Sequence, residues 1–181
     1  HISVQGNVSS PQEAALAVQH GAEGLGLVRT EFLFNNRADA PGETEQQAVY
    51  QETLNACRDM SATFRLLDAG GDKPLPFVNI LPEDNPIVGV RGIRAFKRNE
   101  DFFRTQIRAV LQTAPLNQVR IMLPMVTFAE EIIFFKKLIA QEAEQLGIKE
   151  PVQIGAMIEV PSAALTSGQL ARHADFFSIG T

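Results

Sequence analysis

Apolar and polar positions alternate along the chain in two patterns. Short runs rich in Val, Ile, Leu and Phe are separated by longer segments in which apolar residues recur every three or four positions. The first pattern is typical of β-strands and the second of amphipathic helices. Strands are predicted at residues 2–8, 23–29, 62–69, 118–126, 152–160 and 175–181, and helical segments at 9–21, 38–60 (opening with a loop), 99–114, 128–147 and 162–174.

Local signals support the ends of several helices. A Ser at position 9 or 10 caps the first helix, Pro11 lies in its first turn and Gly21 follows its end. Gly147 is expected to end the longest helix in the same way. Inward-facing positions are expected at Val49, Leu54 and Cys57 or Arg58 in the second helix, and at Phe102, Ile107, Val110 and Leu111 in the third.

Residues 78–96 form a different kind of segment. The sequence VNILPEDNPIVGVRGIRAF is too rich in Pro, Gly and polar residues to predict regular structure, and loops of this length usually have a function. Gly70 and Gly71 just before it predict a turn with special backbone angles more strongly than a phosphate cradle, because no helix begins directly after them.

The order of the elements limits the fold. Strands that alternate with helices, without an antiparallel signal, predict a parallel sheet in either a doubly wound open form or a (β/α)8 barrel. A complete barrel needs about 250 residues, so the chain of 181 residues fits a barrel with about six of its eight units. We therefore expect residues 1–181 to be a partial barrel domain of a longer chain.

Composition excludes several classes of protein. The chain is 45% hydrophobic and 20% charged, as in ordinary globular domains. Its net charge of -5 argues against a nucleic-acid surface, and it contains no apolar run long enough for membrane insertion. The single cysteine excludes an internal disulfide and favours a reducing, cytoplasmic location.

Charged residues gather where the predicted strands end. In a barrel the active site is built at the carboxyl ends of the strands, so arginines and acids at these places are candidates for function. Several arginines at one rim indicate a small anion such as a phosphate, because the guanidinium binds it through two hydrogen bonds. The candidates are Arg29, Glu31, Arg65, Asp68, Arg91, Arg94, Met125 and Glu159.

Two of these positions are unusual for strands. Arg65 follows Thr63 and Phe64, and its burial would be costly unless it meets a carboxylate, such as Asp68 or Glu31, or an anionic ligand. Glu159 closes an apolar strand and could hold a cation, since Mg²⁺ binds one or two protein carboxylates and completes its shell with water and substrate oxygens. Rim salt bridges without a ligand remain the alternative for the arginines.

Six motifs in order carry a family resemblance. They are GLGLVRTEFLF, RLLDAGGDKPLPF, NPIVGVRGIR, IMLPMV, GAMIEVPSAA and DFFSIGT. The chain resembles the phosphoenolpyruvate-binding barrel of Enzyme I, the phosphoenolpyruvate-protein phosphotransferase of the bacterial sugar phosphotransferase system. The related phosphoenolpyruvate synthase and pyruvate phosphate dikinase share the Arg-Thr-Glu-Phe and Glu-x-Pro motifs, but GGDKPLP is more similar to Enzyme I.

The resemblance implies roles for individual residues. Arg29, Arg65 and Arg91 are similar to the family's phosphate-binding arginines, and Met157 matches a residue of the same wall. Glu159 matches the carboxylate that binds the Mg²⁺ cofactor. Arg94 is left outside the implied site, since it could belong to a solvated basic face.

The resemblance also implies what lies elsewhere. The histidine that accepts the phosphoryl group from phosphoenolpyruvate and passes it to a phosphocarrier protein belongs to another domain. A second Mg²⁺ ligand and the cysteine that protonates the enolate would lie beyond Thr181, so no catalytic residue is expected in this chain, and Cys57 is expected to be a core residue. The resemblance also implies a homodimer that associates through this domain.

Three other functions stay open from the sequence. One is a catalytically inactive barrel fragment that acts as a dimerisation or regulatory module. The second is a relative of the synthase and dikinase. The third is a lyase or aldolase of the pyruvate-enolate class, which would not need three phosphate-binding arginines.

Overall fold

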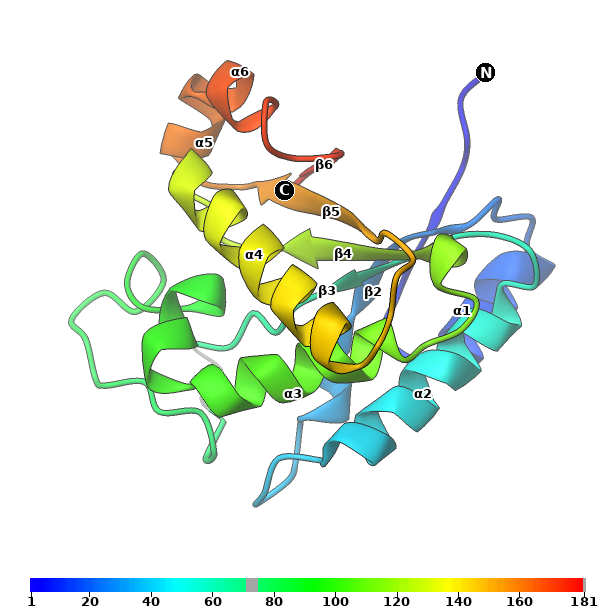
Figure 1. The fold of residues 1–181 in the computed structure, drawn as a ribbon, viewed down its shortest axis with the longest axis horizontal. Coiled ribbons are helices and arrows are strands. Elements are labelled where there is room, and N and C mark those ends of the chain that lie inside the picture. Colours follow the sequence, from blue (N-terminus) through cyan, green and yellow to red (C-terminus); the bar gives the residue numbers. More distant parts are fainter. Residues whose placement is uncertain (71–74, 181) are drawn as a thin grey trace.

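The computed structural model describes residues 1–70 and 75–180, and its centre is a parallel six-stranded sheet (Figure 1). Every pair of neighbouring strands is parallel, and the spatial order β1-β2-β3-β4-β5-β6 is the order along the chain. The strands are β1 (Gly6–Val8), β2 (Leu25–Arg29), β3 (Ala62–Arg65), β4 (Val119–Leu123), β5 (Gln153–Ile158) and β6 (Phe177–Ile179).

The helices connect these strands. They include α1 (Pro11–Gln19), α2 (Glu43–Ala56), α3 (Glu100–Leu111), α4 (Ala129–Gln145), α5 (Pro161–Leu165) and α6 (Ser167–Leu170), together with the 3₁₀ helices η1 (Thr30–Leu33), η2 (Gly92–Arg98) and η3 (Leu116–Gln118). The Ser10 hydroxyl caps α1 by accepting a hydrogen bond from the Glu13 amide at 3.1 Å.

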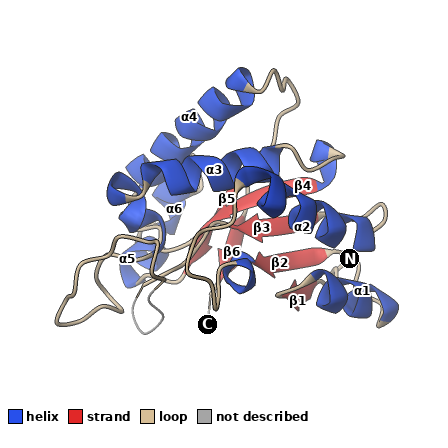
Figure 2. Cartoon of the chain, turned by 90° about the horizontal axis from the view of Figure 1, so that it is seen from below, coloured by secondary structure: helices blue, strands red, loops and turns tan. Residues whose placement is uncertain are grey.

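The topology distinguishes between the two architectures. In a doubly wound sheet the strand order reverses at one point, whereas here it runs in one direction throughout. Consecutive helices also pack side by side, α1 with α2, α2 with α3 and α3 with α4 (Figure 2). The structure is therefore a half-barrel, and the prediction of a barrel-type fold with about six of eight units is confirmed.

The core lies between the sheet and the helices. Tyr50 of α2 packs on Phe64 of β3 with ring centroids 5.3 Å apart, and both side chains are fully buried. Because side chains alternate along a strand, Thr63 and Arg65 point to the opposite, inner face. Cys57 is buried in the core as predicted, whereas Arg58 is exposed.

Several segments differ from the prediction, and β1 and β6 are shorter than predicted. Residues 92–98 form η2 because Asn99 fixes this part of the loop: its side chain donates to the carbonyls of Ala95 and Asn79 and accepts from the Asn79 amide. The predicted helix at 162–174 is divided into α5 and α6.

A further difference is the early end of β3. The backbone amides of Leu67 and Asp68 bond to the side chains of Gln106 and Glu31 instead of to a neighbouring strand, so the ladder ends near Arg65. Gly70 has a φ of +127°, in agreement with the predicted turn, while Gly71 and Lys73 lie outside the described residues. Among the described helices, none is both long and apolar enough to cross a membrane.

Candidate functional site

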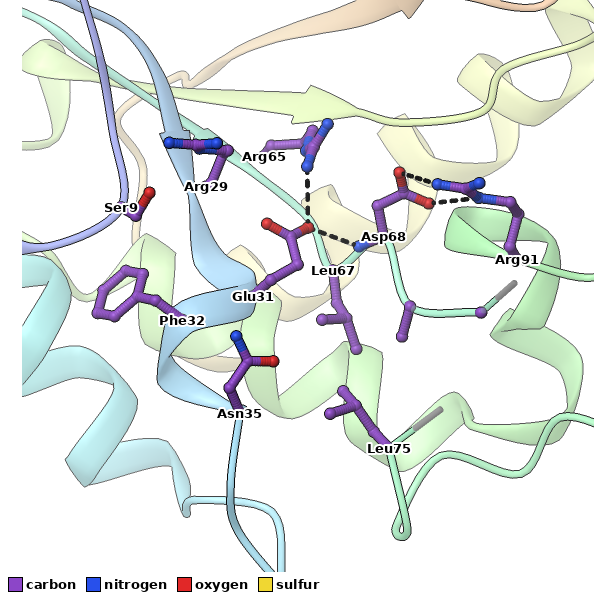
Figure 3. Close-up of a pocket in the computed structure, with 12 residues that line it drawn as sticks. Ser9, Arg29, Glu31, Phe32, Asn35, Arg65, Leu67, Asp68, Leu75 and Arg91 are labelled. Carbon is purple, nitrogen blue, oxygen red and sulfur yellow. Dashed lines mark hydrogen bonds and ion pairs between the residues drawn. The ribbon is translucent and has the colours of Figure 1, made fainter. Parts of the chain in front are cut away.

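The charged residues of β2 and β3 meet at the carboxyl ends of these strands. Arg29 and Arg65 are the last residues of the two strands and are register partners. Both line a cavity of about 350 Å³ (Figure 3). The other lining residues are Ser9, Glu31, Phe32, Asn35, Leu67, Asp68, Ala69, Gly70, Leu75 and Arg91.

Glu31 is the partner of Arg65 in this cavity. Its Oε1 accepts hydrogen bonds from Arg65 Nη2 at 3.1 Å and from the Asp68 amide at 2.9 Å. The two side chains are 22% and 13% exposed, so the ion pair is largely removed from solvent. Glu31 Oε2 and Arg65 Nε are buried without a hydrogen-bond partner in the described part of the chain. Buried polar atoms of this kind are costly unless a ligand or water satisfies them.

Asp68 pairs with Arg91 rather than with Arg65. Arg91 donates through Nε to Oδ1 at 3.1 Å and through Nη2 to Oδ2 at 2.8 Å, which is a bidentate pair (Figure 3). A Cβ added to Gly70 would lie 2.6 Å from the Arg91 Cβ. The glycine therefore allows the loop that carries Arg91 to approach the end of β3.

Met157 and Glu159 extend the site toward β5. The Met157 sulfur lies 3.7 Å from Arg65 Nη1, although Met157 is not among the residues that line the 350 Å³ cavity. Glu159 Oε1 accepts a hydrogen bond at 2.8 Å from the amide of Met125, whose φ is +57°. Glu159 lines a second cavity of about 400 Å³, and Arg91 lines both cavities.

The side chain of Arg94 is hydrogen-bonded to the loop that precedes it. Its guanidinium donates to the carbonyls of Val88 and Gly89 at 3.1 and 3.2 Å and to Thr127 Oγ1 at 2.7 Å. These bonds join the loop to the turn after β4. Arg94 also lines the second cavity, and the three bonds just described are all to protein oxygens.

A metal would have a limited set of protein ligands here. In residues 1–70 and 75–180 no group of three His, Cys, Asp or Glu side chains is placed to hold an ion. A single carboxylate beside an anion-binding cavity suits Mg²⁺, because this ion keeps waters and binds substrate oxygens. Glu159 fits this description, since one of its carboxylate oxygens bonds to Met125 and the side chain lines the second cavity.

The sequence identified the arginines and named Glu31 as one of two possible partners of Arg65, which the structure confirms, but it missed other supports of the site. Asp68 was a candidate partner for Arg65, and its pairing with Arg91 across 23 positions has no local signal in the sequence. Gln106 was also missed, because it lies on the apolar face of a helix and no motif marks it. A fully polar residue at an inward helical position is the one signal that could have identified it.

Arginines and acids at the carboxyl ends of half-barrel strands define an anion-binding α/β domain. The chain belongs to the family of PEP-utilising enzymes, and residues 1–181 match the description "PEP-utilising enzyme, PEP-binding domain". It is 46% identical over 180 residues to the "Multiphosphoryl transfer protein" of Rhodobacter capsulatus, covering 99% of this chain and 22% of the relative. It is 36% identical over 186 residues to the "Phosphoenolpyruvate-protein phosphotransferase" of Bacillus subtilis, covering 100% of this chain and 33% of the relative.

A solved structure supports the fold. A citrate lyase from Burkholderia xenovorans matches with a TM-score of 0.58 at 16% identity, over 98% of this chain and 48% of that chain. At this identity the likeness concerns the fold alone. The chain spans between 22% and 33% of the length of the two relatives named above.

Proposed function

We propose that this chain is the phosphoenolpyruvate-binding portion of a phosphoenolpyruvate-protein phosphotransferase. In this proposal the phosphoryl group passes to a histidine in another domain and then to a phosphocarrier protein that serves sugar uptake. The observation that carries the proposal is the convergence of Arg29, Arg65 and Arg91 on one cavity. Membership of the PEP-utilising family supplies the identity of the anion.

The arrangement suits loose phosphoryl transfer. The three guanidinium groups would bind the phosphate and carboxylate oxygens and stabilise the charge that spreads over the migrating group. Glu31 and Asp68 hold Arg65 and Arg91 in place before the substrate enters, which lowers the entropic cost of binding. The phosphorus–oxygen bond of phosphoenolpyruvate breaks, a phosphorus–nitrogen bond to histidine forms, and an enolate remains.

Met157 and Glu159 would complete the site. The Met157 sulfur accepts a hydrogen bond from Nη1 of Arg65. Glu159 would hold Mg²⁺ together with water and substrate oxygens. When bound, the ion neutralises part of the phosphate charge. We further propose a cytoplasmic protein that works as a homodimer.

The proposal is tested by phosphoryl transfer in the protein that carries this chain. The protein is incubated with phosphoenolpyruvate labelled in the phosphate, with Mg²⁺ and without nucleotide. Acid-labile, base-stable label on a histidine supports the proposal. Label that requires ATP or another donor would move the protein to the synthase and dikinase branch, and no label under any condition would favour an inactive module.

A further inference from the structure

A buried glutamine connects the ends of β2 and β3. Gln106 lies on α3 and is fully buried among apolar residues. Its Oε1 accepts a hydrogen bond from the Leu67 amide at 2.9 Å, and its Nε2 donates to Thr30 Oγ1 at 3.0 Å. A backbone amide can only donate, so the contact with Leu67 fixes which way the side-chain amide is turned.

Thr30 connects Gln106 to the candidate site through hydrogen bonds. Its fully buried hydroxyl accepts from Gln106 and donates to the backbone carbonyl of Arg65 at 2.8 Å. Thr30 lies between Arg29 and Glu31 in the sequence. One side chain on α3 is thus hydrogen-bonded, directly and through Thr30, to the two segments that carry Arg29, Glu31 and Arg65.

The other side of Gln106 is anchored in α2. Its Nε2 also donates to the hydroxyl of Tyr50 at 3.2 Å, and this hydroxyl donates to Gln46 Oε1 at 3.2 Å. Gln46 in turn donates to the carbonyl of Pro41 at 2.9 Å. Burial raises the pKa of Tyr50, so the phenol stays protonated and keeps its donor. Both amide hydrogens and the amide oxygen of Gln106 are therefore used.

We propose that Gln106 is a positioning residue that holds the ends of β2 and β3 in the register that phosphoenolpyruvate binding requires. This inference rests on the proposed function. Gln106 does not line the cavity, so its effect reaches the substrate through Thr30 and the Leu67 amide. Satisfied buried networks of this kind fix one arrangement of the groups around them. Without the amide, the two segments would lose their common partner while the core around Tyr50 and Phe64 would keep its packing.

The test compares variants of the protein that carries this chain. Gln106→Leu removes every polar contact at similar volume, and Thr30→Val removes the hydroxyl while Thr30→Ser keeps it. Thr53→Val is the matched control, since Thr53 is equally buried and its hydroxyl donates to the Val49 carbonyl of its own helix. The measurements are kcat and KM for phosphoenolpyruvate, the Kd of phosphoenolpyruvate and the thermal midpoint of each variant.

We expect Gln106→Leu and Thr30→Val to raise KM and Kd about tenfold, with kcat within about threefold of wild type, because uniform binding is lost. Thr30→Ser keeps the hydroxyl, and Thr53→Val loses a bond within α2 that does not reach the cavity, so both should stay within about twofold of wild type in KM. If Gln106→Leu does not fold, the comparison of Thr30→Val with Thr30→Ser decides the question.

Two results would overturn the inference. The first is that Gln106→Leu and Thr53→Val have the same KM while the wild-type protein binds phosphoenolpyruvate. This result would remove the positioning role and leave the proposed function intact. The second is equal KM values for Thr30→Val and Thr30→Ser. A wild-type protein that neither binds nor uses phosphoenolpyruvate would instead refute the proposed function, and the inference with it.

Discussion

Replacing Arg65 by methionine removes the guanidinium group from the centre of the proposed site. The methionine keeps an apolar chain against Met157, so the change is mainly one of charge and hydrogen bonding. Arg65 makes a bond of 3.1 Å to Glu31 and is 13% exposed on its side chain. Loss of the guanidinium should therefore lower both the stability of the folded protein and its affinity for the ligand.

The structure gives a magnitude for each effect. A hydrogen bond between charged groups contributes about 1.5–3 kcal/mol, so losing one arm of the phosphate site should cost at least about 2 kcal/mol of substrate binding, or about 30-fold in KM. Stability should fall by about 1–3 kcal/mol, below the cost of breaking a fully buried pair. The smaller value follows because Glu31 is 22% exposed and keeps its bond to the Asp68 amide.

The assay is phosphoryl transfer from phosphoenolpyruvate at a series of substrate concentrations, together with urea unfolding. Arg120→Met is the control, because Arg120 lies on β4 and its guanidinium is 5.8 Å from the centre of the Phe176 ring, whereas it does not line the cavity. We expect the control to retain the wild-type KM. An Arg65→Met protein that folds and has an unchanged KM would refute the assignment of Arg65 to the site.

Three further predictions concern other parts of the chain. Glu159→Gln should raise the Mg²⁺ concentration for half-maximal activity about tenfold or more; an unchanged metal requirement would argue against Glu159. Burial raises the pKa of the Cys57 thiol from 9.0 to about 11. At pH 8 iodoacetamide should therefore label Cys57 only in the unfolded protein, and stability should decrease as pH rises from 9.0 toward about 11, because the unfolded thiol ionises first; rapid native labelling would contradict this. Glu142 is 1% exposed between Arg104 and Arg108, so Glu142→Gln should lower the free energy of unfolding by about 1–3 kcal/mol in a urea titration, and no change would show that the pairs add little.

The sequence predicted the fold well because the fold depends on repeated local patterns. Each strand is an apolar run, and each of the longer helices carries its own apolar face, so the order of the strands and of these helices could be predicted directly. The ends were harder to place. The strand β3 ends at Arg65 instead of continuing toward Gly70, because side chains from distant elements bind the next backbone amides.

The candidate site, like the fold, could be predicted only in part. Arg29, Arg65 and Arg91 stood out as charged residues in ordered motifs, and the structure brings them to one cavity. The sequence named Asp68 and Glu31 as possible partners of Arg65, and the structure confirms Glu31, but no local pattern decides between the two acids. The contact between Thr30 and Gln106, which are 76 positions apart, could not be predicted. Contacts over such separations depend on the packing of helices on the sheet, which no local pattern records.

The most direct test of the account is a crystal structure of the protein that carries this chain with phosphoenolpyruvate and Mg²⁺. The account predicts the phosphate in the cavity that Arg29, Arg65 and Arg91 line, with the metal against Glu159. Phosphoenolpyruvate bound at any other place, with Arg65 and Arg91 still paired to Glu31 and Asp68, would contradict it.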